Sequence, residues 1–484
     1  MSLSPARPAY LGIDLGTSQL KALLLAPDGR ILGRGRARYP VTVPTQGQAE
    51  TDPGQWWRAA GEAVREALTE ANDADVQSVA IAGQMHGVVL ADPAGVPLRP
   101  AILWLDRRAA AESVAYGELP ARLTAPLGNQ PSPGMAGPIL RWLAAHEPGN
   151  VAAARWALQP KDWLRLRLTG EAATDPTDAS GTLLFDLTCG TWASALVEAL
   201  GINADLLPGI RDPADSAGRL LPAAATHLGL PPGLPVATGA ADTAAALFAV
   251  GLPDDAALLT LGTGGQWIAP AGTSARPAAG TNLFRAIGGD CYRLGAVQNM
   301  GETINWVRTV LGVSWEHAYS TAARPWRADT PVFLPYLTEE RWDPAATGTW
   351  AGLSLGHDRD DLLRSALEGV AFLLRDRLRD LRAAGHDPAR VVLGGGGARH
   401  PAWRQLLADV LSLPLYAAAT TWLSAGGAAR LAGAARDGDA PPVPGVALEA
   451  PITRAAAPAA VTAAYDRFRT LRRTTGSAGT AAGR

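Results

Sequence analysis

Two stretches in different halves of the chain place short apolar runs around a glycine-rich turn. Residues 9–38 hold three apolar runs separated by turns, which predicts three short strands. Residues 256–270, "AALLTLGTGGQWIAP", repeat the order of strand, glycine turn and strand. An amphipathic pattern that predicts a helix follows each unit. The first helix is expected at 52–69, with a proline at its start, and the second at 358–385. The pattern therefore predicts two related α/β domains, 1–245 and 246–484.

The intervening sequence fits the same alternation of strands and helices. Two apolar runs flank a polar loop in "VQSVAIAGQMHGVVLAD", and helical spacing occurs at 137–146 and 160–168. Residues 234–251 are typical of a strand that continues into an alanine-rich helix. Residues 389–411 predict a strand, a glycine loop and a helix. The small polar residues of 474–484 predict a frayed end.

Composition narrows the class of protein. The 484 residues are 47% hydrophobic and 18% charged, with a net charge of −2, which is typical of a globular protein with no basic field for nucleic acid. No apolar run approaches the roughly 20 residues of a membrane span, and no signal-peptide pattern begins the chain, so we expect neither nucleic acid nor a membrane as partner. The two cysteines, Cys189 and Cys291, exclude a disulfide framework and favour a cytoplasmic location. The seven histidines show no zinc-ligand spacing.

Lysine usage is unusual. Lysine and arginine together number 43, but only Lys21 and Lys161 are lysines. A compact ammonium could be needed at these two positions, where a planar guanidinium would not fit. The alternative is that these two lysines have no special role and are present by chance.

Three glycine turns carry the candidate chemistry. The first, 14–18, joins an aspartate to a glycine and two hydroxyls and is followed by Lys21; the others are "TLGTGG" at 260–265 and "LGGGGAR" at 393–399. Glycine turns let backbone N–H groups approach phosphate closely. None of the three fits the P-loop or the dinucleotide-binding spacing. For the first turn alone, an Asx-type turn beside a solvated lysine is an alternative.

In this order, the three turns resemble the two phosphate loops and the adenosine loop of the actin-like ATPases. The resemblance implies an α/β fold of two actin-like ATPase (ribonuclease H-like) domains flanking a central cleft that binds ATP. It also implies that Asp14 belongs to the shell of a Mg²⁺ ion. The residues expected to contact ATP are Gly16, Thr17, Ser18, Lys21, Gly262, Thr263, Gly264, Gly395, Gly396 and Gly397.

Further motifs resemble the FGGY family of carbohydrate kinases over nearly the whole chain. They are "GQMHG" (83–87), "ILWLDRRA" (102–109), the segment 159–186, "GAADTAA" (239–245) and the segment 350–376. "GQMHG" is the most discriminating of them, because it is similar to the xylulokinase branch, whereas glycerol kinases differ there. The segment 159–186 is also close to that branch.

The resemblance implies roles for individual side chains. Asp242 is the expected general base and a second carboxylate for Mg²⁺; a plain helix N-cap is the competing interpretation. At the cap, the helix N-terminus would keep this carboxylate ionised. Met85 and His86 would line the sugar pocket, since neutral imidazole both donates and accepts hydrogen bonds.

Other implied roles are less specific. Trp104 would form an apolar wall and Asp106 would accept a sugar hydroxyl, although a tryptophan is also a common core residue. Asn299 would lie near the substrate or phosphate. We interpret Lys161 and Glu368 as structural residues.

The sequence departs from the family pattern at three places. Leu105 stands where an asparagine is common, and "TEERWDP" (338–344) and "TTWLSAGGAA" (420–429) also differ. The first departure bears on sugar specificity and the last on the adenine environment.

These features together predict an ATP- and Mg²⁺-dependent kinase of a ketopentose, which converts D-xylulose to D-xylulose 5-phosphate. The expected partners are a small sugar and ATP, and a homodimer is one assembly that the sequence allows. Another FGGY sugar or polyol kinase, acting on ribulose or gluconate, is the alternative. A non-catalytic sugar or nucleotide sensor is less favoured, because Asp14, Gly262, Thr263 and Asp242 are all present. A chaperone-type ATPase is disfavoured by the "GQMHG" motif.

Overall fold

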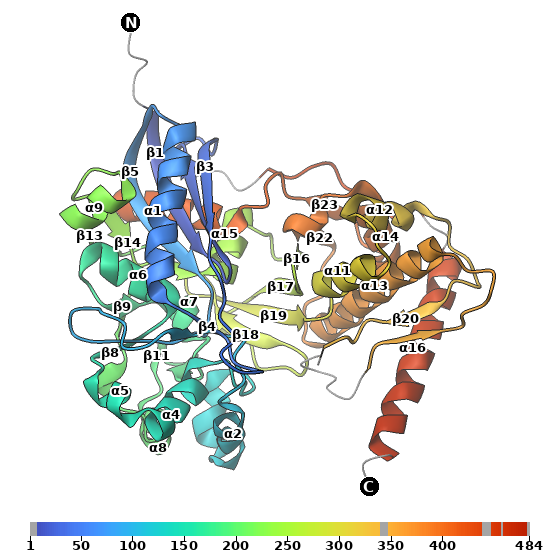
Figure 1. Cartoon of the computed structure of the whole chain (residues 1–484), viewed down its shortest axis with the longest axis horizontal. Coiled ribbons are helices and arrows are strands. Elements are labelled where there is room, and N and C mark those ends of the chain that lie inside the picture. The colour runs from blue at the N-terminus through green and yellow to red at the C-terminus, as the bar shows by residue number, and fades with distance from the viewer. Residues whose placement is uncertain (1–6, 339–346, 438–446, 456–457, 482–484) are drawn as a thin grey trace, which may run out of the picture. The chain divides into compact units, whose positions relative to one another are not determined.

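The computed structural model describes residues 7–338, 347–437, 447–455 and 458–481 (Figure 1). The chain forms two compact units. The first contains Met1–Gly251, Leu283–Cys291 and Trp422–Val446; the second contains Leu252–Asn282, Tyr292–Thr421 and Ala447–Arg484. Within the described residues, no helix has the length and apolar character needed to cross a membrane.

The first unit is built on a mixed sheet with the strand order β13-β14-β5-β1-β2-β3. The antiparallel strands β1, β2 and β3 confirm the three strands predicted for 9–38. Strand β5 runs parallel to β1, and β14 runs parallel to β5. The bounds are β1 Arg7–Leu15, β2 Gln19–Leu25, β3 Ile31–Arg38, β5 Ala74–Gly83, β13 Ser216–Arg219 and β14 Pro235–Ala237.

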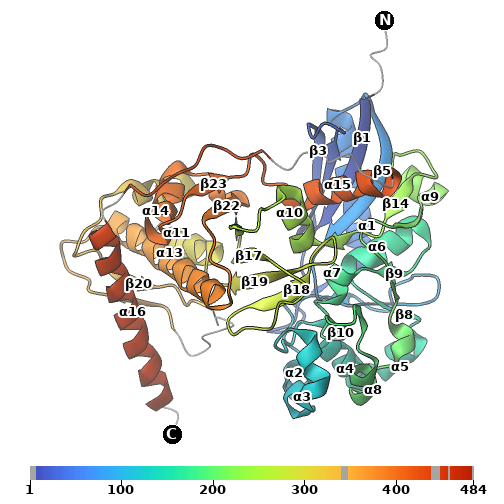
Figure 2. The same cartoon turned by 180° about the vertical axis from the view of Figure 1, so that it is seen from behind.

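Helices cover both faces of this sheet. Side chains alternate across a strand, so Leu11 and Ile13 of β1 share one face, where they join the core of α1 (Pro53–Glu70). Gly12 points to the other face, where α15 (Leu423–Asp437) packs; a Cβ on Gly12 would lie 2.0 Å from the carbonyl oxygen of Ala425. The helix α1 is in front of the sheet in Figure 1, and α15 is in front of it in Figure 2.

Shorter elements complete the first unit. Both predicted helices, 137–146 and 160–168, are confirmed as α4 and α6. The helices are α2 Ala110–Val114, α3 Ala121–Thr124, α4 Ala136–His146, α5 Pro148–Ala153, α6 Pro160–Thr169, α7 Pro176–Ala179, α8 Ser194–Ala199, α9 Pro222–Leu228 and α10 Asp242–Val250. The strands are β4 Glu50–Thr51, β6 Val89–Ala91, β7 Ala101–Ile102, β8 Trp156–Leu158, β9 Ala173–Thr174, β10 Phe185–Asp186, β11 Thr191–Trp192, β12 Gly209–Ile210 and β15 Ala240–Ala241.

The second unit repeats the plan of an antiparallel pair beside parallel strands. Its strands follow the order β19-β17-β16-β22-β23; β16 and β17 are antiparallel, while β22 lies parallel to both β16 and β23. The strands are β16 Ala256–Leu261, β17 Gly265–Ala271, β19 Cys291–Val297, β20 Val332–Leu334, β21 Thr349–Ala351, β22 Arg390–Gly394 and β23 Leu415–Ala417. The helices are α11 Gly301–Val310, α12 Trp315–Ser320, α13 Arg359–Ala383, α14 Pro401–Leu411 and α16 Pro458–Ala481. Strand β18 spans Asn282–Arg285.

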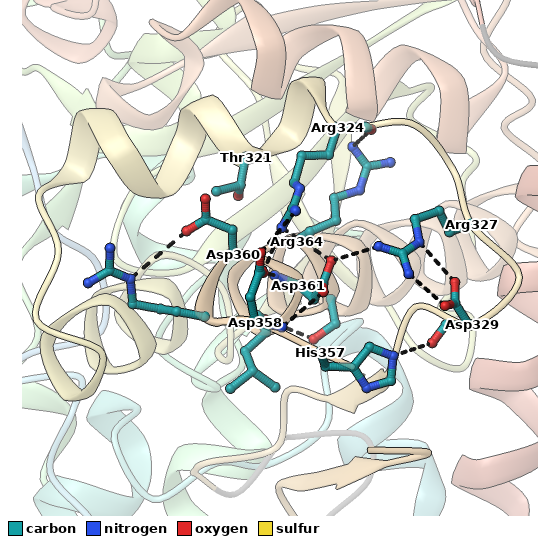
Figure 3. A network of polar contacts seen from close by, with 12 residues as sticks. Thr321, Arg324, Arg327, Asp329, His357, Asp358, Asp360, Asp361 and Arg364 are labelled. Atoms are coloured by element: carbon teal, nitrogen blue, oxygen red, sulfur yellow. Dashed lines mark hydrogen bonds and ion pairs between the residues drawn. The ribbon is translucent and has the colours of Figure 1, made fainter. Parts of the chain in front are cut away.

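A polar network fixes the start of the long helix α13 (Figure 3). Asp358 and Asp361 form a capping box, in which each side chain accepts from the other residue's backbone N–H. Arg324 binds both oxygens of Asp358, at 2.9 and 3.2 Å. His357 Nε2 lies 2.9 Å from the carbonyl oxygen of Asp329. These contacts join the loops that flank β20 and α13 within the second unit.

One expectation differs from the structure, and another falls mostly outside the described residues. The expected boundary between 245 and 246 lies within α10, the compact units place α15 with the first unit, and the division into 1–245 and 246–484 stays a prediction. The frayed end predicted from residue 474 is wrong up to Ala481, because α16 continues to that residue. Of the segment 338–344, only Thr338 lies among the described residues.

Candidate active site

The turn after β1 is held by hydrogen bonds to its backbone. The carbonyl oxygen of Gly16 accepts from the Tyr39 hydroxyl and from Gln84 Nε2, the latter at 3.3 Å. The N–H of Gly16 donates to the carbonyl oxygen of Gln19 at 3.1 Å. Thr17 is half-buried and Ser18 is exposed, so the tip of this turn presents its hydroxyls at the surface of the first unit.

The two charged residues of this turn form an ion pair. Asp14 is 5% exposed and Lys21 Nζ donates to its Oδ2 at 3.1 Å. Asp14 raises the pKa of Lys21 most strongly; burial opposes this effect, and Asp242 adds to it. The ammonium is therefore paired with Asp14, which disfavours a plain turn with a free lysine.

Asp242 is the first residue of α10. The N-cap is Ala241, so the prediction that Asp242 occupies the cap is wrong by one position; Asp242 Oδ1 instead accepts from the Thr243 N–H and hydroxyl, at 2.5 and 3.0 Å. Burial raises the pKa of Asp242 to about 6, and the negative charge of Asp14 adds to this, while Thr243 and Lys21 lower it. The expectation that the helix terminus alone keeps this carboxylate ionised is therefore incomplete.

His86 and Met85 lie on the loop after β5. His86 has a φ of 76°, in the left-handed region, and its Nδ1 lies 2.6 Å from the carbonyl oxygen of Gly181. That carbonyl selects the tautomer with the proton on Nδ1, which leaves Nε2 as the acceptor of a neutral ring. A Cβ on Gly181 would lie 2.9 Å from both the His86 ring and Met85 Cε, so residue 181 must be small. This combination of strain and close packing is typical of a functional loop.

Trp104 and Asp106, which follow β7, have different environments. Trp104 is 37% exposed, and its indole N–H donates to the Thr17 hydroxyl at 3.0 Å, which links the expected sugar wall to the first turn. Asp106 is buried, and both of its oxygens accept hydrogen bonds, from the Ala49 N–H and from Arg108. The sugar contact expected of Asp106 stays a prediction, since its carboxylate is bonded to protein here.

In the second unit, the other two glycine turns meet at the end of β16. The turn Gly262–Gly264 closes with a 2.9 Å hydrogen bond from the Gly262 N–H to the Gly264 carbonyl oxygen. Gly395 has a φ of 86°, and a Cβ there would lie 2.5 Å from the carbonyl oxygen of Leu261. A Cβ on Gly397 would also contact Leu261, at 3.1 Å, whereas Gly396 has open space. Gly262 and Thr263 are exposed, so this turn lies at the surface of the second unit.

Asn299 is 1% exposed and binds Thr338 through both ends of its amide. Its Nδ2 donates to the Thr338 carbonyl oxygen, and its Oδ1 accepts from the Thr338 N–H, both at 2.8 Å. These contacts fix a loop of the second unit. A contact of Asn299 with substrate or phosphate stays a prediction.

The segment 420–429 is divided between the units. Thr421 lies 3.5 Å from Arg399, beside the third glycine loop in the second unit. From Leu423 onward, the segment belongs to α15 and packs on α10, where a Cβ on Gly427 would lie 1.9 Å from the Ala245 carbonyl oxygen. Only its first residues thus lie beside the loop expected to bind adenosine.

Sequence reasoning missed several polar side chains of the first unit. Tyr39 and Gln84 bind the turn at Gly16, and Thr243 binds Asp242. Gln84 stands within the "GQMHG" motif and Thr243 follows the expected base, so both had a local signal. Tyr39 had none, because its contact is made 23 residues away along the chain.

Asp14 and Asp242 suit a magnesium ion. Each carboxylate is partly shielded from water, and the charge on Asp14 raises the pKa of Asp242. A divalent cation would relieve this repulsion, and Mg²⁺ is commonly held by one or two carboxylates together with phosphate oxygens. Among the residues that the structure describes, the acidic group with metal-ligand spacing is elsewhere, at Asp162, Asp175 and Asp178.

Comparisons with known proteins identify the family of the chain. Residues 9–249 match the N-terminal domain, and residues 257–436 the C-terminal domain, of the FGGY family of carbohydrate kinases. The chain belongs to this family and is a phosphotransferase of the carbohydrate kinase class. It is 36% identical over 411 residues to a xylulose kinase of Escherichia coli, with 83% of this chain and 84% of the relative covered. A solved xylulose kinase from Brucella ovis is 31% identical, with a TM-score of 0.89, covering 97% of this chain and 99% of that one.

The fold alone does not distinguish substrates. A gluconate kinase structure from Lactobacillus acidophilus, 24% identical, has a TM-score of 0.88 and covers 97% of this chain and 98% of its own. Both structures confirm the expected two-domain α/β architecture. The particular sugar must be argued from the residues of the site.

Proposed function

We propose that this protein transfers the γ-phosphoryl group of ATP to D-xylulose and produces D-xylulose 5-phosphate. The observation that carries the proposal is Asp242 as the first residue of α10, with its Oδ1 bonded to the Thr243 N–H, in the unit that also contains the Asp14–Lys21 ion pair; burial raises its pKa to about 6. A carboxylate with this pKa is mostly ionised at neutral pH and is a stronger base than an ordinary aspartate.

Asp242 would accept the proton of the sugar hydroxyl as that oxygen attacks phosphorus. Such transfers pass through a loose transition state, so positioning and electrostatics account for most of the acceleration. In the first unit, the hydroxyls of Thr17 and Ser18 would contact phosphate oxygens. A Mg²⁺ ion held by Asp14 and Asp242 would offset the charge of the phosphates.

The sugar would bind at the loop that carries Met85 and His86. The bond between His86 Nδ1 and the Gly181 carbonyl oxygen sets the ring so that Nε2 accepts from a sugar hydroxyl. Trp104 supplies a partly exposed ring next to Thr17. Xylulose is favoured over gluconate by the "GQMHG" motif and by the relatives whose names state xylulose kinase.

Ribulose, gluconate and other polyols are the competing substrates, because Leu105 departs from the family pattern and is 44% exposed. The test is an ADP-release assay of the purified protein with D-xylulose, D-ribulose, gluconate and glycerol, followed by ³¹P NMR of the product. We expect the highest kcat/KM with D-xylulose and a phosphate ester at the terminal carbon. A higher kcat/KM with another sugar would reassign the substrate. Absence of sugar-dependent ADP release with every compound would support the sensor.

Two further parts of the proposal concern the protein in the cell. We propose a cytoplasmic location, supported by the low cysteine content of the chain, which has only Cys189 and Cys291. A homodimer remains the proposed assembly, and size-exclusion chromatography with light scattering measures it directly.

A further inference from the structure

Five fully buried charged residues form one cluster in the first unit. Lys161 Nζ lies 2.6 Å from Asp162 Oδ1, 2.7 Å from Asp175 Oδ2 and 3.2 Å from Asp178 Oδ2. Arg165 Nη1 lies 2.8 Å from the same oxygen of Asp162. All five side chains are 0% exposed. Burying so many charges is costly, and a cluster of this kind persists only with close pairing.

The chain supplies its own cation to the three aspartates. Their oxygens lie within 4.8 Å of one another, a spacing that could hold a metal ion, but the ammonium of Lys161 already contacts all three. Burial opposes the charge of Lys161, yet the three carboxylates raise its pKa. Burial raises the pKa of Asp178 well above its usual range, and the charge of Lys161 opposes this. A compact ammonium touches three carboxylates in a way that a planar guanidinium does not.

The cluster is connected to the residue before Asp242. Asp175 caps α7: its Oδ1 accepts from the Thr177 N–H at 2.8 Å and also from the Thr177 hydroxyl. The same hydroxyl oxygen accepts from the Ala241 N–H at 2.8 Å. The Thr177 hydroxyl donates its proton to Asp175. A lone pair of the Thr177 oxygen is therefore directed at the Ala241 N–H. Arg165 adds a second connection, since its Nη1 donates to the Thr238 carbonyl oxygen at 2.8 Å.

The other end of α7 is connected to His86. The Gly181 N–H donates to the Asp178 carbonyl oxygen at 2.9 Å, and the Gly181 carbonyl oxygen pairs with His86 Nδ1 at 2.6 Å. The four-residue helix α7 therefore lies between the buried cluster and two residues of the site. One of these, Asp242, is the proposed base, and the other, His86, is the proposed sugar ligand.

We infer that the Lys161 cluster is a positioning device for catalysis, which acts through the Thr177 hydroxyl on the backbone that carries Asp242. The inference rests on the proposed function. Thr177 touches neither ATP nor sugar in this account; it accepts from the Ala241 N–H and so holds the backbone that leads into Asp242. Displacement of a reacting group by about 1 Å can cost up to about 10²-fold in rate.

The test compares Thr177→Val with Thr177→Ser. Valine keeps the shape of threonine but can neither accept from Ala241 nor donate to Asp175, whereas serine keeps the hydroxyl. We expect Thr177→Val to lower kcat with D-xylulose by about tenfold or more, with the KM for ATP within about twofold of wild type. Thr177→Ser should retain most of the activity. Thr226→Val is the matched control, because Thr226 is an exposed threonine whose hydroxyl donates to the Pro222 carbonyl oxygen within α9, at 3.0 Å.

The outcomes separate this inference from the proposed function. The wild-type protein is first assayed with the sugar panel, and inactivity with every sugar contradicts the proposed function. An active wild type with an equally active Thr177→Val contradicts the inference alone. If Thr177→Val does not fold, Thr177→Ala replaces it with the same expectation. If Thr177→Val and Thr177→Ala both fail to fold while Thr177→Ser folds, the Thr177 hydroxyl is needed for the stability of the fold, and this result overturns the positioning role.

Discussion

Lys21 donates a hydrogen bond from its Nζ to Asp14 Oδ2 at 3.1 Å. The two residues lie on neighbouring strands, β1 and β2, where Asp14 and Lys21 are directly paired across the sheet. Both influence Asp242, in opposite directions: Asp14 raises its pKa and Lys21 lowers it. Burial is the main cause of the raised pKa of the proposed base, and this ion pair between β1 and β2 modifies it.

Replacement of Lys21 should make the base titrate at a higher pH. Lys21→Gln removes the positive charge that lowers the pKa of Asp242, so this pKa should rise above its value of about 6. Activity requires the ionised carboxylate, and the acidic limb of the kcat/KM profile for sugar should therefore move to higher pH. A limb that stays in place in the variant would contradict the coupling between Lys21 and Asp242.

Replacement of Asp14 should move the same limb in the other direction. Asp14→Asn removes a negative charge that raises the pKa of Asp242, so the acidic limb should move to lower pH. The absolute rate should fall as well, because the proposed Mg²⁺ site loses a carboxylate. Profiles of the two variants and wild type, measured at the same ionic strength, give the comparison. Shifts in the same direction for both variants would be inconsistent with the assignment.

His86→Ala should separate sugar binding from nucleotide binding. Loss of the imidazole removes a hydrogen-bond partner of the sugar, so the KM for D-xylulose should rise by about tenfold or more, while the dissociation constant for ATP changes by less than about twofold. Isothermal titration with ATP and steady-state kinetics with the sugar measure the two effects. His146→Ala, at an exposed position on α4, is the control. Equal losses for both ligands would give His86 a structural role.

Gly12→Ala tests the packing of α15 on the first sheet. The new Cβ would lie 2.0 Å from the Ala425 carbonyl oxygen, so backbone must shift, and the free energy of unfolding should fall by about 1–3 kcal/mol. Gly117→Ala is the matched control, since its Cβ would meet nothing within 4 Å and its φ is not positive. Denaturant unfolding of both variants measures the difference. A loss no larger in Gly12→Ala than in the control would show that α15 does not pack as described.

Local patterns predicted the elements that carry the site. Apolar alternation gave β1, β2 and β16, and the proline-initiated pattern of 52–69 gave α1 almost to the residue, because each signal is contained within one element. The position of α15 could not be predicted in this way. It packs on β1 through Gly12, more than 400 residues earlier, and nothing within either segment encodes that contact.

Burial and charge coupling explain the remaining differences. The pattern of 159–186 was sufficient to interpret Lys161 as structural, but not to show that its ammonium contacts three carboxylates. For Asp242, local propensity predicted an ionised helix cap, whereas burial and the charge of Asp14 raise its pKa. The nearest charges come from distant parts of the chain, so their effect appears only after folding.

The rate of D-xylulose phosphorylation by Asp242→Asn tests the central claim most directly. Asparagine keeps the size of the side chain and cannot accept the proton, so kcat should fall by about 10²–10⁴-fold while ATP binding is retained. The variant should remain folded. The pKa of Asp242 is about 6 in the folded protein and roughly 3.9 for an aspartate in an unfolded chain, so the fold loses stability as this carboxylate ionises between these two pH values. Asparagine carries no charge and avoids this loss. A folded Asp242→Asn that binds ATP and retains more than about a tenth of the wild-type kcat would contradict the assignment of Asp242 as the base.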